Sequence, residues 1–381
     1  MDFTLDAEQV ALRDAVRSLL GRAYDSSETR REVTKTDPGW DEKTWQQLAE
    51  MGALGLPFAE EDGGFGAGPV EVSIVAEEIG RVIAPEPYVE TVVLAGGLVA
   101  AAGTAEQRAE IIGALAEGAL VPVFAHVEPG SRYSEAATGV SATPSGNGWT
   151  LTGVKEPVLG GARADVLIVS AAVDGGTGLF VVRGDASGLS RTSYATFDGG
   201  RAARVALDAT PAVPLGEAGA DQSATIAAVV AQAQVAYGHE SLGAMDTALK
   251  QTTEYLKTRK QFGVPLMTFQ ALTFRAADMY VSLELARSTV TWATLVLLDA
   301  GDPAEALEAA ARAKLQVSKA GRHIGQEAIQ LHGGIGMTAE YSVGHFTSRL
   351  TAIDHALGDG RHHLTALSRT LDGHGVIEPL P

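Results

Sequence analysis

The sequence predicts an α+β protein in which a helical domain, a central antiparallel β domain and a four-helix bundle follow one another along the chain. Three observations predict this order. Apolar residues recur at helical spacing in the first third of the 381 residues. Short β-branched runs then lie between glycine-, serine- and aspartate-rich turns, and long helical patterns return after Asp221. We expect the domains at residues 1–118, 119–217 and 218–381.

Helices dominate the expected first domain. Asp6 is a predicted N-cap, and an apolar stripe follows it as far as Leu20. Gly52 ends a second helix, and the three glycines within 63–66 predict a loop, because glycine adopts backbone conformations that other residues resist. Helices after the first are expected over residues 42–51, 69–81 and 104–116.

The expected second domain consists of strands. Runs such as 121–125, 149–152 and 166–169 are rich in valine, isoleucine, leucine and threonine, and turn residues separate them. The gaps between the runs are too short for the helical crossovers that parallel pairing requires. We therefore expect antiparallel pairing.

Long helices form the expected third domain. One is predicted over 223–258, and the next carries apolar residues at alternating spacings of four and three from Leu272 to Leu297, which is typical of a seam between packed helices. A third starts after Asp302, a capping residue followed by proline. Helices of this length joined by short loops predict an up-and-down bundle.

Composition excludes several classes of function. The chain has 29 Lys and Arg against 47 Asp and Glu, a net charge of −18, which opposes binding to nucleic acid or an anionic membrane. No cysteine is present, which excludes disulfides and cysteine-based metal or catalytic sites. We see no signal peptide and no apolar run of the roughly 18 to 20 residues that a membrane span requires. We expect a soluble, cytoplasmic protein.

Two segments contain combinations of residues that helix packing alone does not require. Residues 255–263 end a long helix with a basic turn, an aromatic residue and a glycine, although cations and glycine also simply terminate helices. Residues 330–336 place three glycines in four positions between two helices, where backbone amides can approach a phosphate or a ring edge. The second segment lacks the strand that a dinucleotide-fold fingerprint or a P-loop requires.

A histidine-rich segment near the end of the chain is the third candidate. His355 and Asp359 have the spacing of one helical face, with His362 and His363 close by, and such a set could hold a metal. Gly358 interrupts that helix, and partner helices carry no matching carboxylates. We expect no metal site.

Together, the domain order and the two motifs resemble the FAD-dependent acyl-CoA dehydrogenases over nearly the whole chain. Arg259 and Gln330 are 71 residues apart, and the pair is far more specific than either motif alone. The segment 349–363 is most similar to the small subunits of pimeloyl-CoA-type and related heteromeric dehydrogenases. Supporting similarity covers residues 56–66, 127–130 and 149–155.

The resemblance implies that FAD binds between subunits and that both motifs hold its nucleotide end. Arg259 matches an arginine that reaches the flavin diphosphate of a neighbouring subunit, and Phe262 matches an aromatic residue beside the adenosine half. Arginine suits a diphosphate through its fork of donors, and glycine permits close approach. The cofactor-binding residues implied are Arg259, Gln261, Phe262, Phe269, Gln330, Gly333 and Gly334.

The chain departs from the family at the catalytic base. Family members use a carboxylate to remove the α-proton of the acyl thioester while the flavin takes a hydride from the β-carbon. Aligned through Arg349, the usual glutamate position is Gly358, and the rarer position, aligned through Arg259, is Ala233. Two other acids are candidate replacements: Glu240, inside the long helix, where burial would raise its pKa toward a useful range, and Asp359, beside the vacant position. A packing or surface role for Glu240 stays open.

Contacts to the flavin ring are also reduced. Val127, Pro157, Leu159 and Gly360 stand where the resemblance implies hydroxyl or aromatic residues. The adenosine side is thus retained and the ring side is not. One member of an unequal pair of subunits would show this asymmetry.

The function predicted is FAD-dependent α,β-dehydrogenation of an acyl-CoA, with this chain as one subunit of a heteromeric enzyme. The implied partners are the acyl-CoA substrate, an electron-transfer flavoprotein or similar acceptor, and a homo- or hetero-oligomer arranged as a dimer of dimers. The alternatives are a non-catalytic partner subunit and a repurposed fold with lyase, cyclase or oxygenase chemistry. Small residues at Gly238, Gly243 and Ala244 admit a bulky acyl group or close helix packing.

Overall fold

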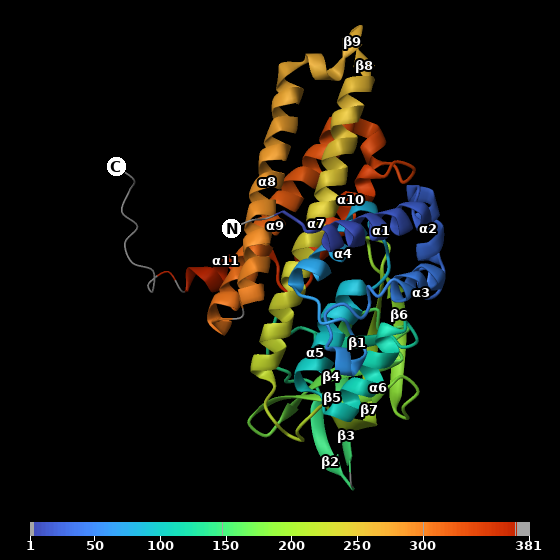
Figure 1. Cartoon of the computed structure of the whole chain (residues 1–381), viewed down its shortest axis with the longest axis vertical. Helices are drawn as coiled ribbons and strands as arrows, with labels where there is room; N and C mark the ends of the chain where they lie inside the picture. The colour runs from blue at the N-terminus through green and yellow to red at the C-terminus, as the bar shows by residue number, and fades with distance from the viewer. Residues whose placement is uncertain (1–3, 147, 300, 370, 372–381) are drawn as a thin grey trace.

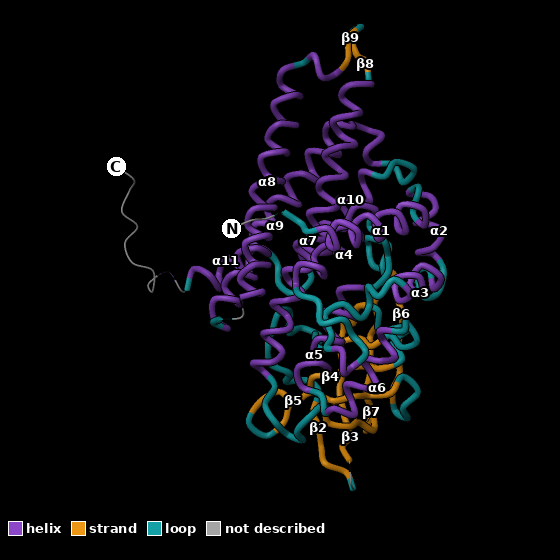
Figure 2. The backbone as a smooth tube through the Cα atoms, viewed as in Figure 1, coloured by secondary structure: helices purple, strands orange, loops and turns teal. Residues whose placement is uncertain are grey.

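The computed structural model describes residues 4–146, 148–299, 301–369 and 371. It has the predicted order of helices, strands and helices, with the β domain at one end and the long helices extending to the other (Figures 1 and 2). Helices give way to strands between Ala116 and Pro122, and strands to helices between Pro214 and Ser223. The domain boundaries stay a prediction, and these two changes of structure fall at them.

The first segment forms the predicted helices. Asp6 caps α1 as expected: its carboxylate accepts the backbone N–H groups of Glu8 and Gln9, while the Gln9 side chain accepts from the backbone of Asp6. The elements are α1 (Ala7–Ala23), α2 (Ser27–Lys35), α3 (Glu42–Glu50), the short helix η1 (Glu60–Asp62), α4 (Pro69–Val82), the π-helix η2 (Val89–Gly96), α5 (Gly97–Ala102) and α6 (Ala105–Ala116).

One sheet forms the β domain, with its neighbours in the order β1-β4-β2-β3-β7-β5, β6 on β7, and β4 pairing β5 as well. The strands are β1 (Pro122–Ala125), β2 (Ser141–Ser145), β3 (Gly148–Leu159), β4 (Val166–Val173), β5 (Gly176–Arg183), β6 (Leu189–Ala195) and β7 (Arg201–Pro214). Most pairs are antiparallel, but β1 pairs β4 in parallel from Pro122 opposite Val166. The prediction of antiparallel pairing throughout is wrong here, because the β2–β3 hairpin serves as the crossover that we assigned only to helices.

The last segment is the predicted bundle. The residues Met279, Leu283, Ala286, Val290 and Ala293 of α8 are buried along the expected seam. The elements are α7 (Ser223–Thr258), the strands β8 (Lys260–Gln261) and β9 (Val264–Pro265), η3 (Leu266–Thr268), α8 (Gln270–Asp299), α9 (Pro303–His332), η4 (Gly333–Met337), α10 (Val343–His355) and α11 (Gly360–Ser368).

The outer side of α8 is apolar as well. Phe274, Val281 and Leu285 are each more than half exposed, and 28% of the most apolar window of this helix is buried. By length and composition α8 could cross a membrane, but it is one helix, and bundle helices pass the same test. Its buried seam against α7 and α9 shows that it belongs to the bundle.

Helix α7 crosses α4 at very short distance. A Cβ added at Gly243 would lie 2.0 Å from the carbonyl oxygen of Glu77, and one added at Gly80 would lie 1.8 Å from that of Glu240. A Cβ at Gly238 would meet the Val290 side chain at 3.1 Å. These glycines therefore serve helix packing, which was the alternative to a bulky acyl pocket.

Candidate functional site

The two motifs meet at one end of the bundle. They line a cavity of about 350 Å³ between the end of α7, the β8–β9 hairpin and the turn after α9. Of the predicted cofactor-binding residues, Arg259, Gln261, Gln330 and Gly333 line this cavity, which we call the clamp cavity. The expected meeting of two segments that are far apart in sequence is present within a single chain.

Local backbone geometry explains why these residues converge. Arg259 is extended after the last turn of α7, and its carbonyl accepts the N–H of Leu266, which closes the small hairpin. Phe262 and Gly263 at the hairpin tip have φ values of +53° and +83°. Gly333, with φ +67°, ends α9 in a conformation that favours glycine.

Two arginines line the clamp cavity, and one of them is already paired. Arg275, one of its lining residues, donates to both oxygens of Glu327, at 2.5 and 2.9 Å. In the described part of the chain, no hydrogen bond or ion pair engages the side chain of Arg259. Its fork of donors is thus available for an anion, and a diphosphate fits that chemistry.

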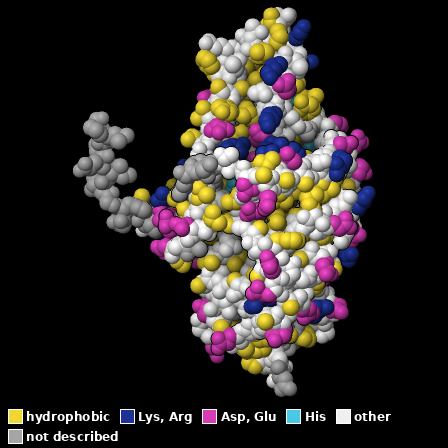
Figure 3. All heavy atoms as spheres, in the orientation of Figure 1, with side chains coloured by type: hydrophobic (Ala, Val, Ile, Leu, Met, Phe, Trp, Pro, Cys, Tyr) yellow, Lys and Arg dark blue, Asp and Glu magenta, His cyan; other side chains and the backbone are white. Residues whose placement is uncertain are grey.

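Three predicted residues lie beside the cavity rather than in its wall. Phe262 is 92% exposed, and its ring meets that of Phe269 edge-on at 6.1 Å between centroids. A Cβ at Gly334 would have nothing within 4 Å. Figure 3 shows hydrophobic and basic side chains side by side over this end of the bundle. An aromatic residue this exposed is typical of a surface that a ligand or another subunit covers.

Sequence reasoning missed one wall of the cavity. His332, between the predicted Gln330 and Gly333, packs in tilted contact against Tyr255 at 4.5 Å and Tyr341 at 5.0 Å between ring centroids. Its Nδ1 lies 2.7 Å from the carbonyl oxygen of Ala328. The sequence signal was its position inside the glycine motif, which we interpreted through the glycines alone.

Glu240 is a buried partner of an arginine. Its side chain is 1% exposed, and it accepts a hydrogen bond from Nε of Arg349 at 2.6 Å. Arg349 also donates to Asp198 at 3.0 Å and lies 3.9 Å from Glu90. Burial raises the pKa of Glu240, although Arg349 opposes the rise. Glu240 lines neither of the two cavities described here, so the geometry does not favour its predicted role as base.

Asp359 is also engaged. It caps α11 by accepting the N–H of His362 at 2.8 Å, and it lies 3.4 Å from Arg132. Although desolvation opposes the change, the His362 N–H and the Arg132 guanidinium hold the pKa of Asp359 below its usual range. A capping carboxylate with a lowered pKa is a poor proton acceptor. Its role as base stays a prediction without geometric support.

The position of the usual base is filled. Gly358 has φ +103°, and a Cβ there would lie 2.5 Å from Nε2 of His363 and 2.8 Å from Cδ2 of His362. Its carbonyl accepts a hydrogen bond from Nζ of the buried Lys314 at 3.0 Å, which fixes the loop between α10 and α11. Side chains of the α11 helix therefore occupy the space that a longer side chain at Gly358 would need.

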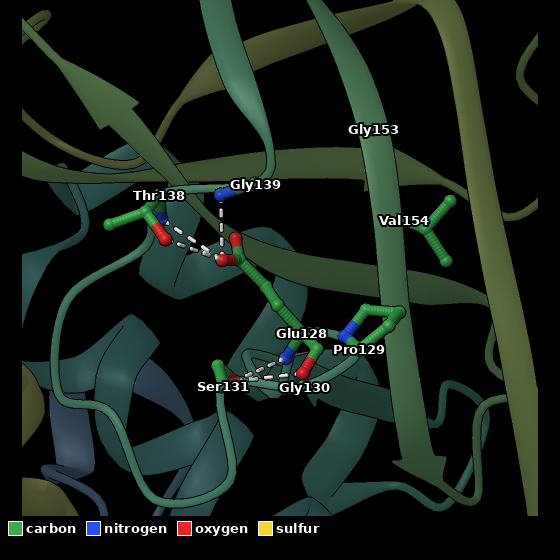
Figure 4. A pocket seen from close by; sticks show the side chains of 8 residues that line it. All are labelled: Glu128, Pro129, Gly130, Ser131, Thr138, Gly139, Gly153 and Val154. Carbon is green, nitrogen blue, oxygen red and sulfur yellow. Dashed lines mark hydrogen bonds between the residues drawn. The ribbon is translucent and has the colours of Figure 1, made fainter.

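A second cavity, of about 460 Å³, lies on the β domain (Figure 4). In it Glu128 accepts N–H groups from Thr138 and Gly139, and it pairs with the buried Lys155 at 2.8 Å. Burial opposes ionisation, but these donors lower the pKa of Glu128 to about 2. The carboxylate is thus saturated and holds the loop after β1 in place.

The histidine-rich segment was the third candidate from the sequence. Across the described ranges, no group of three or more His, Asp or Glu side chains could hold a metal ion. In the histidine-rich segment, His363 Nε2 lies 3.2 Å from the carbonyl oxygen of Leu357, and Asp359 caps α11.

Comparison with known proteins connects most of the chain to one family. The acyl-CoA dehydrogenase N-terminal domain matches residues 6–119, and the acyl-CoA dehydrogenase C-terminal domain matches residues 225–371. Acyl-CoA dehydrogenase FadE12 of Mycobacterium tuberculosis is 30% identical over 355 residues, which cover 90% of each protein.

Two solved structures have the same fold over nearly their full length. A chain of a variant of the Tcur3481-Tcur3483 steroid ACAD is 33% identical with a TM-score of 0.88, covering 97% of this chain and 99% of that chain. A chain of the ChsE4-ChsE5 complex from Mycobacterium tuberculosis is 28% identical with a TM-score of 0.88, covering 99% of this chain and 100% of that chain. The second of these structures is a complex of two differently named proteins.

Proposed function

Because this chain belongs to the acyl-CoA dehydrogenase family, oxidoreductases that act on the CH–CH group of acyl-CoA, we propose that it is one subunit of a heteromeric, FAD-dependent member. In this proposal the chain contributes the nucleotide end of the flavin site. A partner of the same family that retains the catalytic glutamate contributes the base and the ring contacts.

The space around Gly358 carries the proposal. A glutamate at this position would need a Cβ within 2.5 Å of His363 and a backbone φ of +103°, a conformation that side chains resist. Glycine stands at the position that the family resemblance assigns to the base, and a side chain there would crowd His362 and His363. The two candidate replacements, Glu240 and Asp359, are already engaged, the first by Arg349 and the second as the cap of α11.

The clamp cavity fits the nucleotide half of FAD. Arg259 has a free guanidinium for the diphosphate, and the backbone at Gly333 and Gly334 is open to close approach. FAD, when bound, accepts the hydride released from the β-carbon of the substrate. The residues of this chain would hold and orient the dinucleotide, and they would not remove the α-proton.

Exposed apolar surface supports an oligomer. Phe262 at the clamp cavity and the outer side of α8 with Phe274, Val281 and Leu285 are open to solvent in the single chain. Large apolar side chains exposed in this way are expected at contacts between chains. We propose a dimer of dimers, and we keep an electron-transfer flavoprotein or similar carrier as the electron acceptor.

For the substrate, we propose an acyl-CoA with a bulky acyl group. The support is the 33% identity to a chain of a structure described as a steroid ACAD. The glycines of α7 give no support, since they serve packing against α4 and α8.

The experiment compares the chain alone with the chain co-expressed beside a family member that retains the glutamate. We expect flavin absorbance and acyl-CoA oxidation only in the co-expressed complex. Arg259→Gln in that complex should weaken FAD binding about 10- to 100-fold, because charge-assisted hydrogen bonds to a diphosphate contribute about 1.5–3 kcal/mol.

The matched control is Arg183→Gln on β5, whose exposed side chain pairs with Glu110 of α6; this change should leave FAD binding unchanged. Glu240→Gln should leave turnover unchanged as long as the complex assembles. If the chain alone oxidised acyl-CoA and the Glu240→Gln variant lost that activity, the proposal that a partner subunit supplies the base would be refuted.

A further inference from the structure

We propose that His332 is a nucleotide-binding residue whose Nε2 accepts a hydrogen bond from an uncharged donor on the adenosine part of the ligand. This inference rests on the proposed function, because it assigns a new contact to the same cavity. The observation behind it is an unsatisfied atom. His332 is 4% exposed and lines the clamp cavity, and its Nε2 has no hydrogen-bond partner among the residues that the structure describes.

The protonation state of the ring follows from its other nitrogen. Nδ1 lies 2.7 Å from the carbonyl oxygen of Ala328, and a carbonyl only accepts, so Nδ1 carries the proton. Burial lowers the pKa of His332, although the Ala328 carbonyl opposes this, so the ring is neutral. Nε2 therefore presents a lone pair, which binds a hydroxyl or an amine and repels a phosphate.

Neighbouring groups hold the imidazole ring in place, so rotation of the ring does not bring Nε2 to a hydrogen-bond donor. The rings of Tyr255 and Tyr341 pack against it in tilted contacts, and the hydrogen bond to Ala328 fixes its Nδ1 edge. A buried acceptor without a donor costs about 1–3 kcal/mol, a penalty that natural proteins rarely retain without use. In the described residues, it is the one unsatisfied buried side-chain atom that belongs to a lining residue of the clamp cavity.

A ligand gains access through the adjacent turn. Nε2 has no exposed surface in the free chain, so the turn must yield before a donor arrives. Gly333 and Gly334 have nothing within 4 Å of their Cβ positions, which leaves the turn space to move. Arg259 would then bind the diphosphate of the ligand, and His332 would bind a neutral hydrogen-bond donor on the same ligand.

Two groups of a nucleoside diphosphate offer such a donor, the ribose hydroxyls and the adenine amine. ADP tests the contact without the flavin ring, and two analogues separate the sources. IDP lacks the amine, and 2′,3′-dideoxy-ADP lacks the hydroxyls. We expect one of the two analogues to bind about tenfold more weakly than ADP to the wild-type chain, in isothermal titration calorimetry of the full chain alone and in complex with its partner.

The variant His332→Phe keeps the stacked ring and removes both nitrogens. It should bind ADP about tenfold more weakly, while the ligand-free protein unfolds at about the same temperature, because removal of the unsatisfied Nε2 acceptor offsets loss of the Nδ1 hydrogen bond to Ala328. A purely structural histidine would show the opposite split, with lower stability and unchanged affinity. The control His355→Phe replaces an exposed histidine outside the cavity and should change neither quantity.

Equal ADP affinity of His332→Phe and wild type would overturn the inference and leave the proposed function intact. Equal binding of ADP and both analogues to the wild-type chain would overturn it as well, without any variant. Failure of the wild-type chain to bind ADP or FAD in any pairing would refute the clamp itself, and with it the proposed function.

Discussion

Replacing Gly358 by alanine should destabilise the chain by about 2–6 kcal/mol, although the change adds one methyl group. Two effects contribute. A residue with a side chain at φ +103° costs about 1–3 kcal/mol, and the Cβ would lie 2.5 Å from the buried ring of His363, where forced repacking costs another 1–3 kcal/mol. The free energy of unfolding in urea measures the sum.

Gly175 provides the matched control for the backbone effect. Its φ is +93°, but nothing lies within 4 Å of its Cβ position, so Gly175→Ala should lose only about 1–3 kcal/mol. The difference between the two variants isolates the crowding by His362 and His363. Equal losses would show that the site has room for a side chain.

Gly358→Glu extends the test to catalysis. If the space is filled as described, this variant should be less stable than Gly358→Ala and should not oxidise acyl-CoA without a partner. A stable, active Gly358→Glu chain would refute the reasoning that the partner must supply the base.

Two further predictions concern buried charges. Arg349→Met should destabilise the chain by about 3–5 kcal/mol in urea unfolding, because Glu240 and Asp198 lose their buried counterion, whereas Arg183→Gln at an exposed pair should cost less than about 1 kcal/mol. A loss at Arg349 no larger than at Arg183 would contradict this. Burial raises the pKa of Glu86 from 4.5 to about 7, with Tyr24 opposing, so the native state binds the proton more tightly than the unfolded chain. The stabilisation is present below about pH 4.5 and is lost by about pH 7, so Glu86→Gln should gain up to about 3 kcal/mol at pH 8 and little at pH 5. A gain that does not depend on pH would contradict it.

Local sequence signals predicted most of the fold. Asp6 and Asp302 cap their helices as expected, since a side-chain cap depends on only a few neighbouring residues. The seam of α8 was also predictable, because periodicity alone determines which face is buried. The parallel pairing of β1 with β4 was not, since strand neighbours depend on the whole sheet and not on the length of each gap.

The candidate site, like the fold, was predictable from the sequence only in part. The motifs around Arg259 and Gln330 were predictable as a pair, and the structure brings them into one cavity. The partner of Glu240 was not, because Arg349 lies 109 residues away in sequence and reaches it only through the packing of α10 on α7. Burial was the correct expectation for Glu240, but burial alone does not separate a base from a structural ion pair.

The distribution of unpaired polar groups argues for a divided enzyme. A base needs a free lone pair beside the substrate, yet Glu128, Glu240 and Asp359 each accept hydrogen bonds from groups that stabilise the fold. At the other end of the bundle, Arg259 lacks a partner in the described chain, and the neighbouring Nε2 of His332 lacks a donor. A buried acceptor without a donor beside an available arginine is what a bound nucleotide would complete, and this supports the proposal that another subunit carries out proton transfer.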